Sequence, residues 1–391
     1  MHVSYIYLIT FAFSVAMGFI LLPRIVRVAD EKNLYDLPDS RRVHKTPTPR
    51  LGGISFLPVA IMSIFLFNVL SVHFLGARIA PENTLHFMRF QSCAIGAFLL
   101  YMVGITDDMV GVDYRWKFAV QIAVSTLFPL SGLTLHNIFS IFWLDSLPPA
   151  FDYALTMFVV VYIINAINLI DGVDGLAAGI CIITFTLFAF IFLYLQHAFM
   201  VATCLSILGV LIVFFVFNIF GGGSHKMKKL FMGDTGSYTL GYFICFLLLY
   251  IASYRNMKAM GFIRIFDLAV SPLVIPMLDI IRVVWARYRD RVPLFKADKR
   301  HIHHKLLRTG LSPLGTMATM LLLTLMFIGL DIAAPLYLKT RWVILSNIAL
   351  WVLMHLVINY FIRKREARLP ESSYAMHNQT NTISEGKRFE L

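Results

Sequence analysis

Long apolar segments fill most of this 391-residue chain and constrain its fold more than any other feature. A helix needs about 20 consecutive apolar residues to cross the hydrocarbon core of a bilayer. By this criterion the sequence predicts about eleven transmembrane helices. Only 14% of the residues are charged, whereas soluble domains carry about 25%, so the composition excludes a water-soluble fold. The predicted spans cover roughly residues 4–23, 51–76, 91–106, 116–132, 152–168, 176–196, 199–219, 235–253, 265–286, 314–336 and 342–361.

The distribution of Lys and Arg predicts the orientation of these spans. Of the 34 Lys and Arg residues, 27 lie in one of the two alternating sets of loops. Positively charged loops face the cytoplasm, so we expect the N-terminus outside and the C-terminus in the cytoplasm. The prediction is an all-α, polytopic integral membrane protein, with residues 1–365 as one multi-span domain and 366–391 as a flexible cytoplasmic tail. The net charge of +12 then reflects topology and attraction to phosphates or headgroups, and we expect no nucleic-acid partner.

Five short polar segments interrupt the apolar runs, and all five fall on the predicted cytoplasmic side. Their shared side favours one composite site at the cytoplasmic surface of the membrane. The four cysteines lie inside apolar runs, which argues against a disulfide framework or a thiolate metal site. The polar segments are RRVHKTPTPRLGG (41–53), ITDDMVGVDYRWK (105–117), NLIDGVDGLAAG (168–179), KLFMGDTGS (229–237) and ADKRHIHHKLLRTG (297–310).

Two of these segments carry clustered carboxylates. Asn168, Asp171 and Asp174 follow an apolar run at three-residue spacing, and carboxylates at the end of a membrane helix are costly unless they serve a function there. Their oxygen atoms suit Mg²⁺ or Mn²⁺; the alternative is a capping turn before the next helix. Asp107 and Asp108 are adjacent, so their charges repel unless a metal or a positive group compensates them. For this pair the alternative is a solvated helix end.

The other segments offer a further carboxylate and several cations. Asp234, in GDTGS, either caps the helix that follows or carries a metal that bridges to phosphate. The basic side chains suit phosphate or a nucleotide, and their alternatives are topological bias, snorkelling anchors or a solvated loop. Asp279 and Arg282 are three residues apart on one predicted helix and are expected to form a structural ion pair. The candidate substrate-binding cations and histidines are Lys45, Arg50, Lys117, His301, His303 and His304.

The ordered set of motifs is more specific than any one of them. RxxHxxPxPRxGG, DD before a span, NLIDGxDGL, FMGDxGS and HIHHxLLxxG follow one another within residues 33–313. This set resembles the polyprenyl-phosphate N-acetylhexosamine-1-phosphate transferases of glycosyltransferase family 4. That family includes the bacterial enzymes that start O-antigen and teichoic-acid linkage synthesis, and the phospho-MurNAc-pentapeptide translocase. HIHH in a basic loop is more similar to the O-antigen and teichoic-acid branch.

The resemblance implies transfer of a sugar 1-phosphate, by default GlcNAc-1-phosphate from UDP-GlcNAc, to undecaprenyl phosphate with release of UMP. It also implies Mg²⁺, with Mn²⁺ as an alternative, and an active site on the cytoplasmic face of the bacterial inner membrane, where cell-surface polysaccharide synthesis begins. A homodimer is compatible with it. The residues implied to be catalytic are Asp107, Asp108, Asp171 and Asp174. The residues implied to bind the metal are Asp234, Asn168 and Asp108.

Two departures from the family pattern change what is expected. Some relatives have a third acidic residue three positions after the acidic pair, where this chain has Gly111. Relatives often have an Asn about ten residues before the GD aspartate, whereas here Asn218 lies sixteen residues before Asp234. We include Asn218 as a candidate nucleotide contact in this longer loop.

Another class of function stays open at this point. Clustered carboxylates also serve ion- or proton-coupled transporters, although transporters place such charges near the bilayer midplane. A CDP-alcohol phosphotransferase is disfavoured, because DGVDGLAAG lacks the arginine and the downstream aspartates of that signature.

Overall fold

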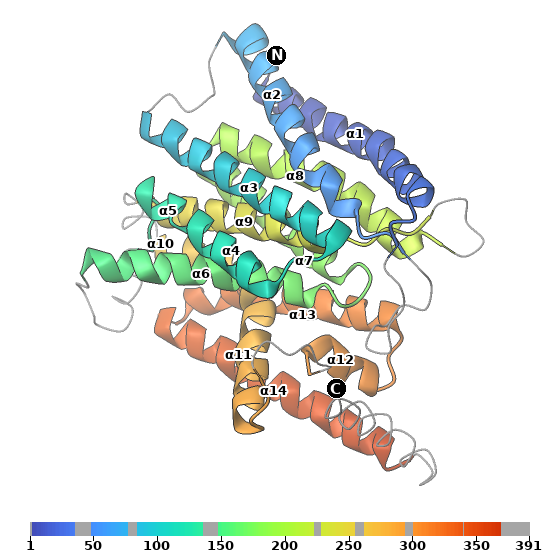
Figure 1. Ribbon diagram of the computed structural model, residues 1–391. Helices are drawn as coiled ribbons and strands as arrows, with labels where there is room; N and C mark the ends of the chain where they lie inside the picture. The colour runs from blue at the N-terminus through green and yellow to red at the C-terminus, as the bar shows by residue number, and fades with distance from the viewer. Residues whose placement is uncertain are drawn as a thin grey trace.

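The computed structural model describes residues 2–35, 48–76, 84–135, 148–222, 228–254, 262–293, 300–338 and 340–368. Helices account for nearly all of the regular structure, and these ranges contain no β-sheet (Figure 1). The predicted all-α fold is therefore confirmed. Residues 369–391, most of the predicted tail, lie outside the described ranges.

The helices follow one another with short connections. The bounds of the elements are α1 Val3–Glu31, η1 Gly52–Ser55, α2 Phe56–Leu75, α3 Thr84–Val110, α4 Tyr114–Ser125, α5 Leu127–Leu130, α6 Pro149–Ile170, α7 Leu176–Tyr194, α8 Ala198–Phe220, α9 Gly233–Ala252, α10 Phe262–Val270, η4 Ser271–Leu273, α11 Val274–Arg289, α12 Ile302–Arg308, α13 Pro313–Ala333, η5 Ala334–Leu336 and α14 Thr340–Glu366.

Within the described ranges, ten helical segments are long and apolar enough to cross a membrane. The predicted span 116–132 is formed by α4 and α5, which hold 12 and 4 residues. Lys117, near the start of α4, contacts Asp107 at the end of α3. Past α5, the carbonyl of Gly132 accepts a hydrogen bond from Arg89, near the start of α3. The α4–α5 pair therefore runs back along α3, as the eleventh predicted span requires.

Helix α9 lies at the centre of the bundle and is the most deeply buried of the candidate spans (Figure 1). Glycines let its neighbours approach closely, as is common between membrane helices. A Cβ atom on Gly104 of α3 would lie 2.4 Å from the Cα of Thr235, and one on Gly53 of η1 would lie 2.2 Å from the backbone nitrogen of Gly236. These close contacts fix the N-terminal end of α9 against α3 and η1.

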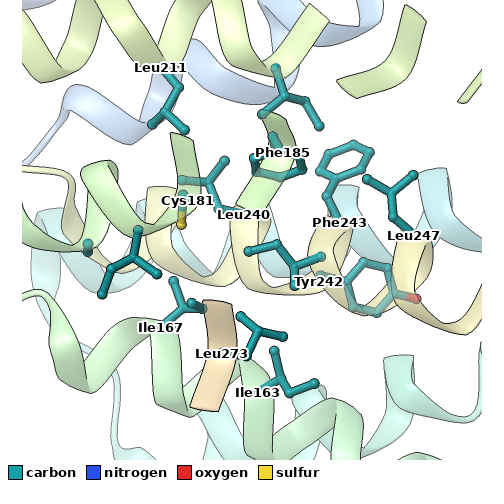
Figure 2. Close-up of a cluster of buried hydrophobic side chains, with 14 of the residues drawn as sticks. Ile163, Ile167, Cys181, Phe185, Leu211, Leu240, Tyr242, Phe243, Leu247 and Leu273 are labelled. Carbon is teal, nitrogen blue, oxygen red and sulfur yellow. The ribbon is translucent and has the colours of Figure 1, made fainter. Parts of the chain in front are cut away.

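One cluster of buried apolar side chains extends from α1 to α14. Figure 2 shows its central part, where Phe185 and Cys181 of α7 face Leu240 and Phe243 of α9. Burial of large apolar side chains is favourable by about 1.5–3 kcal/mol each in water, but inside a bilayer close packing has the larger role. The packed core makes α9 a rigid support for the residues at its N-terminal end.

The C-terminal elements form one side of the bundle (Figure 1). Helix α11 runs at a steep angle to the long helices around it, and short α12 lies beside α13 and α14. The HIHH motif begins at the N-cap of α12, residue His301. Because α12 contacts both α13 and α14, these two helices place the motif against the rest of the site.

Candidate active site

The polar segments meet at one end of the bundle. This end collects the C-termini of α3 and α6, the N-terminus of α9 and the start of η1. Because helix ends carry unsatisfied backbone groups, polar side chains there have backbone partners without leaving the membrane-spanning helices. The composite site predicted from the sequence is therefore present as a spatial cluster.

Asp108 holds the N-terminus of α9. Its Oδ1 accepts a hydrogen bond of 2.8 Å from the backbone N–H of Asp234, and its Oδ2 accepts from the N–H and hydroxyl of Thr235 at 3.0 and 2.6 Å. A carboxylate at this position also compensates the positive end of the helix dipole. The sequence suggested that Asp234 caps this helix, but the cap comes from Asp108 of α3.

Asp234 lies at the centre of the polar cluster. Its Oδ1 accepts a hydrogen bond of 3.0 Å from the side-chain amide of Asn168, which also donates to the Ser237 hydroxyl at 2.9 Å. Its Oδ2 accepts from the Lys117 ammonium at 3.1 Å and from the Tyr238 hydroxyl at 2.7 Å. Asn168 thus orients Asp234 in this structure, and its predicted role as a metal ligand stays a prediction.

Asp107 completes an acidic group with Asp108 and Asp234. Carboxylate oxygens from the three residues lie within 4.8 Å of one another. Asp107 also accepts from the backbone N–H of Val112 at 2.8 Å, and its Oδ1 lies 3.1 Å from the Lys117 ammonium. Three hard oxygen donors at this spacing suit Mg²⁺ or Mn²⁺. The Lys117 ammonium supplies positive charge between two of them, as a bound cation would.

The loop between α6 and α7 places two more carboxylates beside this group. Burial raises the pKa of Asp171 to about 7, and the nearby Asp174 carboxylate raises it further, whereas Arg50 opposes the shift. Asp174 forms an ion pair of 2.5 Å with Lys229. Asp171 is therefore close to the site but only partly ionised near neutral pH, and Asp174 is occupied by a lysine.

The start of η1 joins the segment before α9 through the backbone. Gly52 and Gly53 donate to the carbonyls of Phe231 and Met232, each at 3.0 Å, and Phe231 donates to the carbonyl of Pro49 at 2.8 Å. This pairing places Arg50 beside the acidic cluster, as predicted. Lys45 lies outside the described residues, so its contact with substrate stays a prediction.

Asp279 anchors the HIHH motif. Its Oδ2 lies 2.9 Å from Nδ1 of His301, and the backbone N–H of Ile302 donates to the same carboxylate. The predicted ion pair between Asp279 and Arg282 is confirmed at 2.7 Å, and Arg282 also donates to the carbonyl of Arg300. The pair therefore has a second task, which is to tie α11 to the start of α12.

His303 packs on the loop that carries Asp171. A Cβ atom on Gly172 would lie 2.3 Å from Nε2 of His303, so only a glycine leaves room for the ring. His303 is 2% exposed, and burial lowers its pKa well below the ordinary value. His304 lies against it, with ring centroids 4.3 Å apart. The motif thus reaches the acidic cluster through the α6–α7 loop, with a neutral His303.

Asn218 lies inside the protein rather than on an open surface. Its side-chain oxygen accepts from the N–H of Gly175 at 2.5 Å, and its amide nitrogen donates to the carbonyl of Leu230 at 2.7 Å. Both ends of the amide therefore link the α6–α7 loop to the segment before α9. Its predicted contact with a nucleotide stays a prediction.

Sequence reasoning missed three residues of this cluster. Tyr238 lies one turn after Asp234, and that i, i+4 spacing was available as a signal. Thr235 contacts Asp108, and Lys229 pairs with Asp174, but each pair spans more than 50 positions of sequence. No local pattern links such residues, so these two contacts required the fold.

Comparison with known proteins identifies the family. A model described as "Glycosyl transferase family 4" matches residues 90–252, which hold α3 to α9 and most of the site. A protein of Bacillus subtilis (strain 168), named a probable undecaprenyl-phosphate N-acetylglucosaminyl 1-phosphate transferase, is 30% identical over 78% of this chain and 78% of its own length. The chain belongs to glycosyl transferase family 4.

Two more relatives of this glycosyl transferase family 4 protein carry a related name, undecaprenyl-phosphate alpha-N-acetylglucosaminyl 1-phosphate transferase. The protein of Yersinia pestis is 28% identical over 90% of both chains. The protein of Escherichia coli (strain K12) is 26% identical over 86% of both chains. The similarity therefore covers the spans on both sides of the residues that the family model matches.

Proposed function

We propose that this family 4 glycosyl transferase transfers GlcNAc-1-phosphate from UDP-GlcNAc to undecaprenyl phosphate. A phosphate oxygen of the lipid attacks the phosphorus that carries the sugar, and the bond between that phosphorus and the oxygen of UMP breaks. The products are undecaprenyl-diphosphate-GlcNAc and UMP. The names of three relatives support this reaction.

The observation that carries the proposal is the acidic group of Asp107, Asp108 and Asp234 beside cationic side chains at one end of the bundle. A diphosphate substrate and a phosphate acceptor need charge neutralisation more than a strong base. The ion-coupled transport alternative has no support, because the relatives are named as transferases and the carboxylates meet at helix ends.

A divalent cation fits this donor set. Asp107 and Asp234 would hold Mg²⁺, with Asp108 contributing from the cap of α9, and the ion would stabilise the leaving phosphate as a Lewis acid. Lys117 already balances the charge of Asp107 and Asp234. We infer that its ammonium turns toward substrate phosphate when a cation binds, because two like charges would otherwise share one pair of carboxylates.

Several groups around the acidic cluster would hold the phosphates. Arg50 and Lys229 flank Asp171 and Asp174, and Lys305 lies one turn into α12. Burial lowers the pKa of Lys305 to about 8, and the charge of Arg282 adds to the effect. Lys305 is therefore still mostly protonated near pH 7. His303, being neutral, would contribute hydrogen bonds rather than charge.

The acceptor would need positioning more than activation. The second pKa of a phosphate monoester is about 6, so polyprenyl phosphate is largely dianionic at neutral pH. Asp107, at the end of α3, would orient this phosphate or take its residual proton. We propose direct in-line attack without an aspartyl-phosphate intermediate.

We propose that the site faces the cytoplasm at the bacterial inner membrane, with the N-terminus outside and the C-terminus inside. The excess of Lys and Arg in the loops on the side of the site supports this orientation. UDP-sugars are made in the cytoplasm, so this face would have direct access to the donor. The reaction would begin cell-surface polysaccharide synthesis, and a homodimer stays a prediction.

UMP release tests the proposal directly. Purified protein would receive undecaprenyl phosphate, MgCl₂ and a panel of UDP-sugars, with and without EDTA. We expect UMP release with UDP-GlcNAc that requires both the lipid and the metal. Release with a different UDP-sugar would change the donor and keep the reaction. Failure to bind either lipid or nucleotide would contradict the proposal.

A further inference from the structure

A buried tyrosine that the proposed reaction does not use contacts the central carboxylate. Tyr238 lies one turn after Asp234 on α9, and its hydroxyl donates a hydrogen bond of 2.7 Å to Oδ2 of Asp234. We propose that Tyr238 is a positioning residue that fixes the orientation of the Asp234 carboxylate toward the divalent cation. The inference rests on the proposed function, because that function assigns the cation to Asp234.

Three donors hold Asp234, and they differ in kind. Asn168 donates to Oδ1 at 3.0 Å, and Lys117 and Tyr238 donate to Oδ2 at 3.1 and 2.7 Å. Lys117 reaches the carboxylate from α4 with a long, flexible and charged side chain. Tyr238 belongs to the same helix as Asp234 and has only two rotatable side-chain bonds, so its geometry relative to Asp234 is set by α9 itself.

Binding of a cation separates the two donors to Oδ2. A divalent ion between Asp107 and Asp234 repels the Lys117 ammonium, which lies 3.1 Å from both carboxylates. The tyrosine hydroxyl is neutral and experiences no such repulsion. Oδ2 would therefore keep Tyr238 as a donor when Lys117 leaves, and the carboxylate would stay in one orientation in both states.

The position of the hydroxyl supports a specific role. Tyr238 is 3% exposed in the most buried of the candidate spans, where a buried hydroxyl is costly unless it has a partner. Among the described residues, its hydroxyl has Asp234 as a hydrogen-bond partner. A phenylalanine would fill the same volume without that cost, so the hydroxyl is informative. Hydrogen bonds to the ligands of a metal commonly change metal affinity or activity 10–100-fold.

The test compares two tyrosines on the same helix. Tyr238→Phe removes the hydroxyl beside Asp234, whereas Tyr242→Phe removes a buried hydroxyl one turn further, which donates to the carbonyl of Val124 at 3.2 Å. Full-length protein in detergent, stripped with EDTA, would be titrated with MgCl₂ alone and followed by thermal unfolding. We expect Tyr238→Phe to raise the Mg²⁺ concentration at half-maximal stabilisation about tenfold, and Tyr242→Phe to leave it unchanged.

A second measurement separates positioning from folding. UMP release would be followed against Mg²⁺ concentration for both variants. We expect Tyr238→Phe to raise the apparent KM for Mg²⁺ by about tenfold and to recover most of its kcat at high Mg²⁺. Tyr238→Met, which also fills the space without a hydroxyl, should reproduce the shift.

The outcomes distinguish this inference from the function on which it rests. If wild-type protein responds to Mg²⁺ and releases UMP, but Tyr238→Phe matches Tyr242→Phe at every Mg²⁺ concentration, the role of Tyr238 is wrong and the proposed function stands. If wild-type protein shows neither Mg²⁺-dependent stabilisation nor UMP release, both are wrong.

Discussion

Asp108 accepts a hydrogen bond of 2.8 Å from the backbone N–H of Asp234, so the second carboxylate of the acidic pair caps the helix that carries the central carboxylate. The two residues are far apart in sequence, and α3 brings them together through the close contact of Gly104 with Thr235. One side chain therefore fixes the start of α9 and the place of Asp234. The acidic pair divides its tasks between Asp107, which faces Lys117, and Asp108, which holds the backbone.

Removal of this cap should affect activity more than stability. Loss of a capping carboxylate costs about 1 kcal/mol of stability, but Asp108→Ala would also free the N-terminus of α9 and shift Asp234, so UMP release should fall at least about 100-fold. Asp113→Ala is the matched control, because Asp113 caps α4 by accepting from the N–H of Arg115 at 2.8 Å. Equal loss of activity in the two variants would contradict this role.

Removal of the Lys117 ammonium should have opposite effects on cation binding and turnover. Lys117→Met leaves Asp107 and Asp234 without a positive partner, so Mg²⁺ in the absence of substrate should bind roughly five- to tenfold more tightly, as expected for a partly exposed ion pair of about 1 kcal/mol. UMP release should fall, because the variant lacks a phosphate-binding cation. Thermal unfolding against MgCl₂ and turnover measure the two effects.

Arg115→Met is the control for Lys117→Met, since Arg115 lies on the same helix with its charge near Asp113. It should leave the Mg²⁺ midpoint unchanged. Weaker Mg²⁺ binding by Lys117→Met would mean that the lysine organises the carboxylates instead of competing with the cation.

Asp171 should make the metal-free protein less stable as the pH rises. Burial, together with the Asp174 carboxylate, raises the pKa of Asp171 to about 7, whereas an unfolded chain ionises Asp near pH ~4. Between these values the folded state binds more protons than the unfolded state, so stability falls as the pH rises through that window and levels off above it. The unfolding temperature in EDTA, measured from pH 5 to 8, tests this slope.

Asp171→Asn should flatten the pH dependence, because an amide does not titrate. Asp113→Asn changes an exposed cap and should keep the wild-type slope. A slope that Asp171→Asn leaves unchanged would assign the titration to another group.

The contact between Gly172 and His303 should couple the α6–α7 loop to the HIHH motif. Gly172→Ala would place a methyl group 2.3 Å from Nε2 of His303, so the ring must move and UMP release should fall by about tenfold or more. Gly329→Ala is the control, because a Cβ atom there meets nothing within 4 Å. In a His303→Ala background, Gly172→Ala should have little further effect. Additive losses in the double variant would place the fault in the loop itself.

Much of this protein follows from local sequence. The apolar segments determined an all-α membrane fold, since a lipid environment leaves helices as the way to satisfy backbone hydrogen bonds without a closed barrel. The motifs determined which segments form the site, because carboxylates at the ends of apolar helices persist for a functional reason. Arg50, Asp107, Asn168, Asp234 and the HIHH motif all lie where one composite site requires them.

The tertiary structure decided what each of these side chains does. Asp108 became a cap for α9 and Asn168 a donor to Asp234, because the packing of α3 and α6 on α9 brings them within hydrogen-bond distance. Burial makes His303 neutral and leaves Asp171 partly protonated, and burial depends on neighbours far away in the chain. Spacing along the sequence identifies chemically capable residues, whereas hydrogen-bond partners and local polarity arise only when separate helices meet.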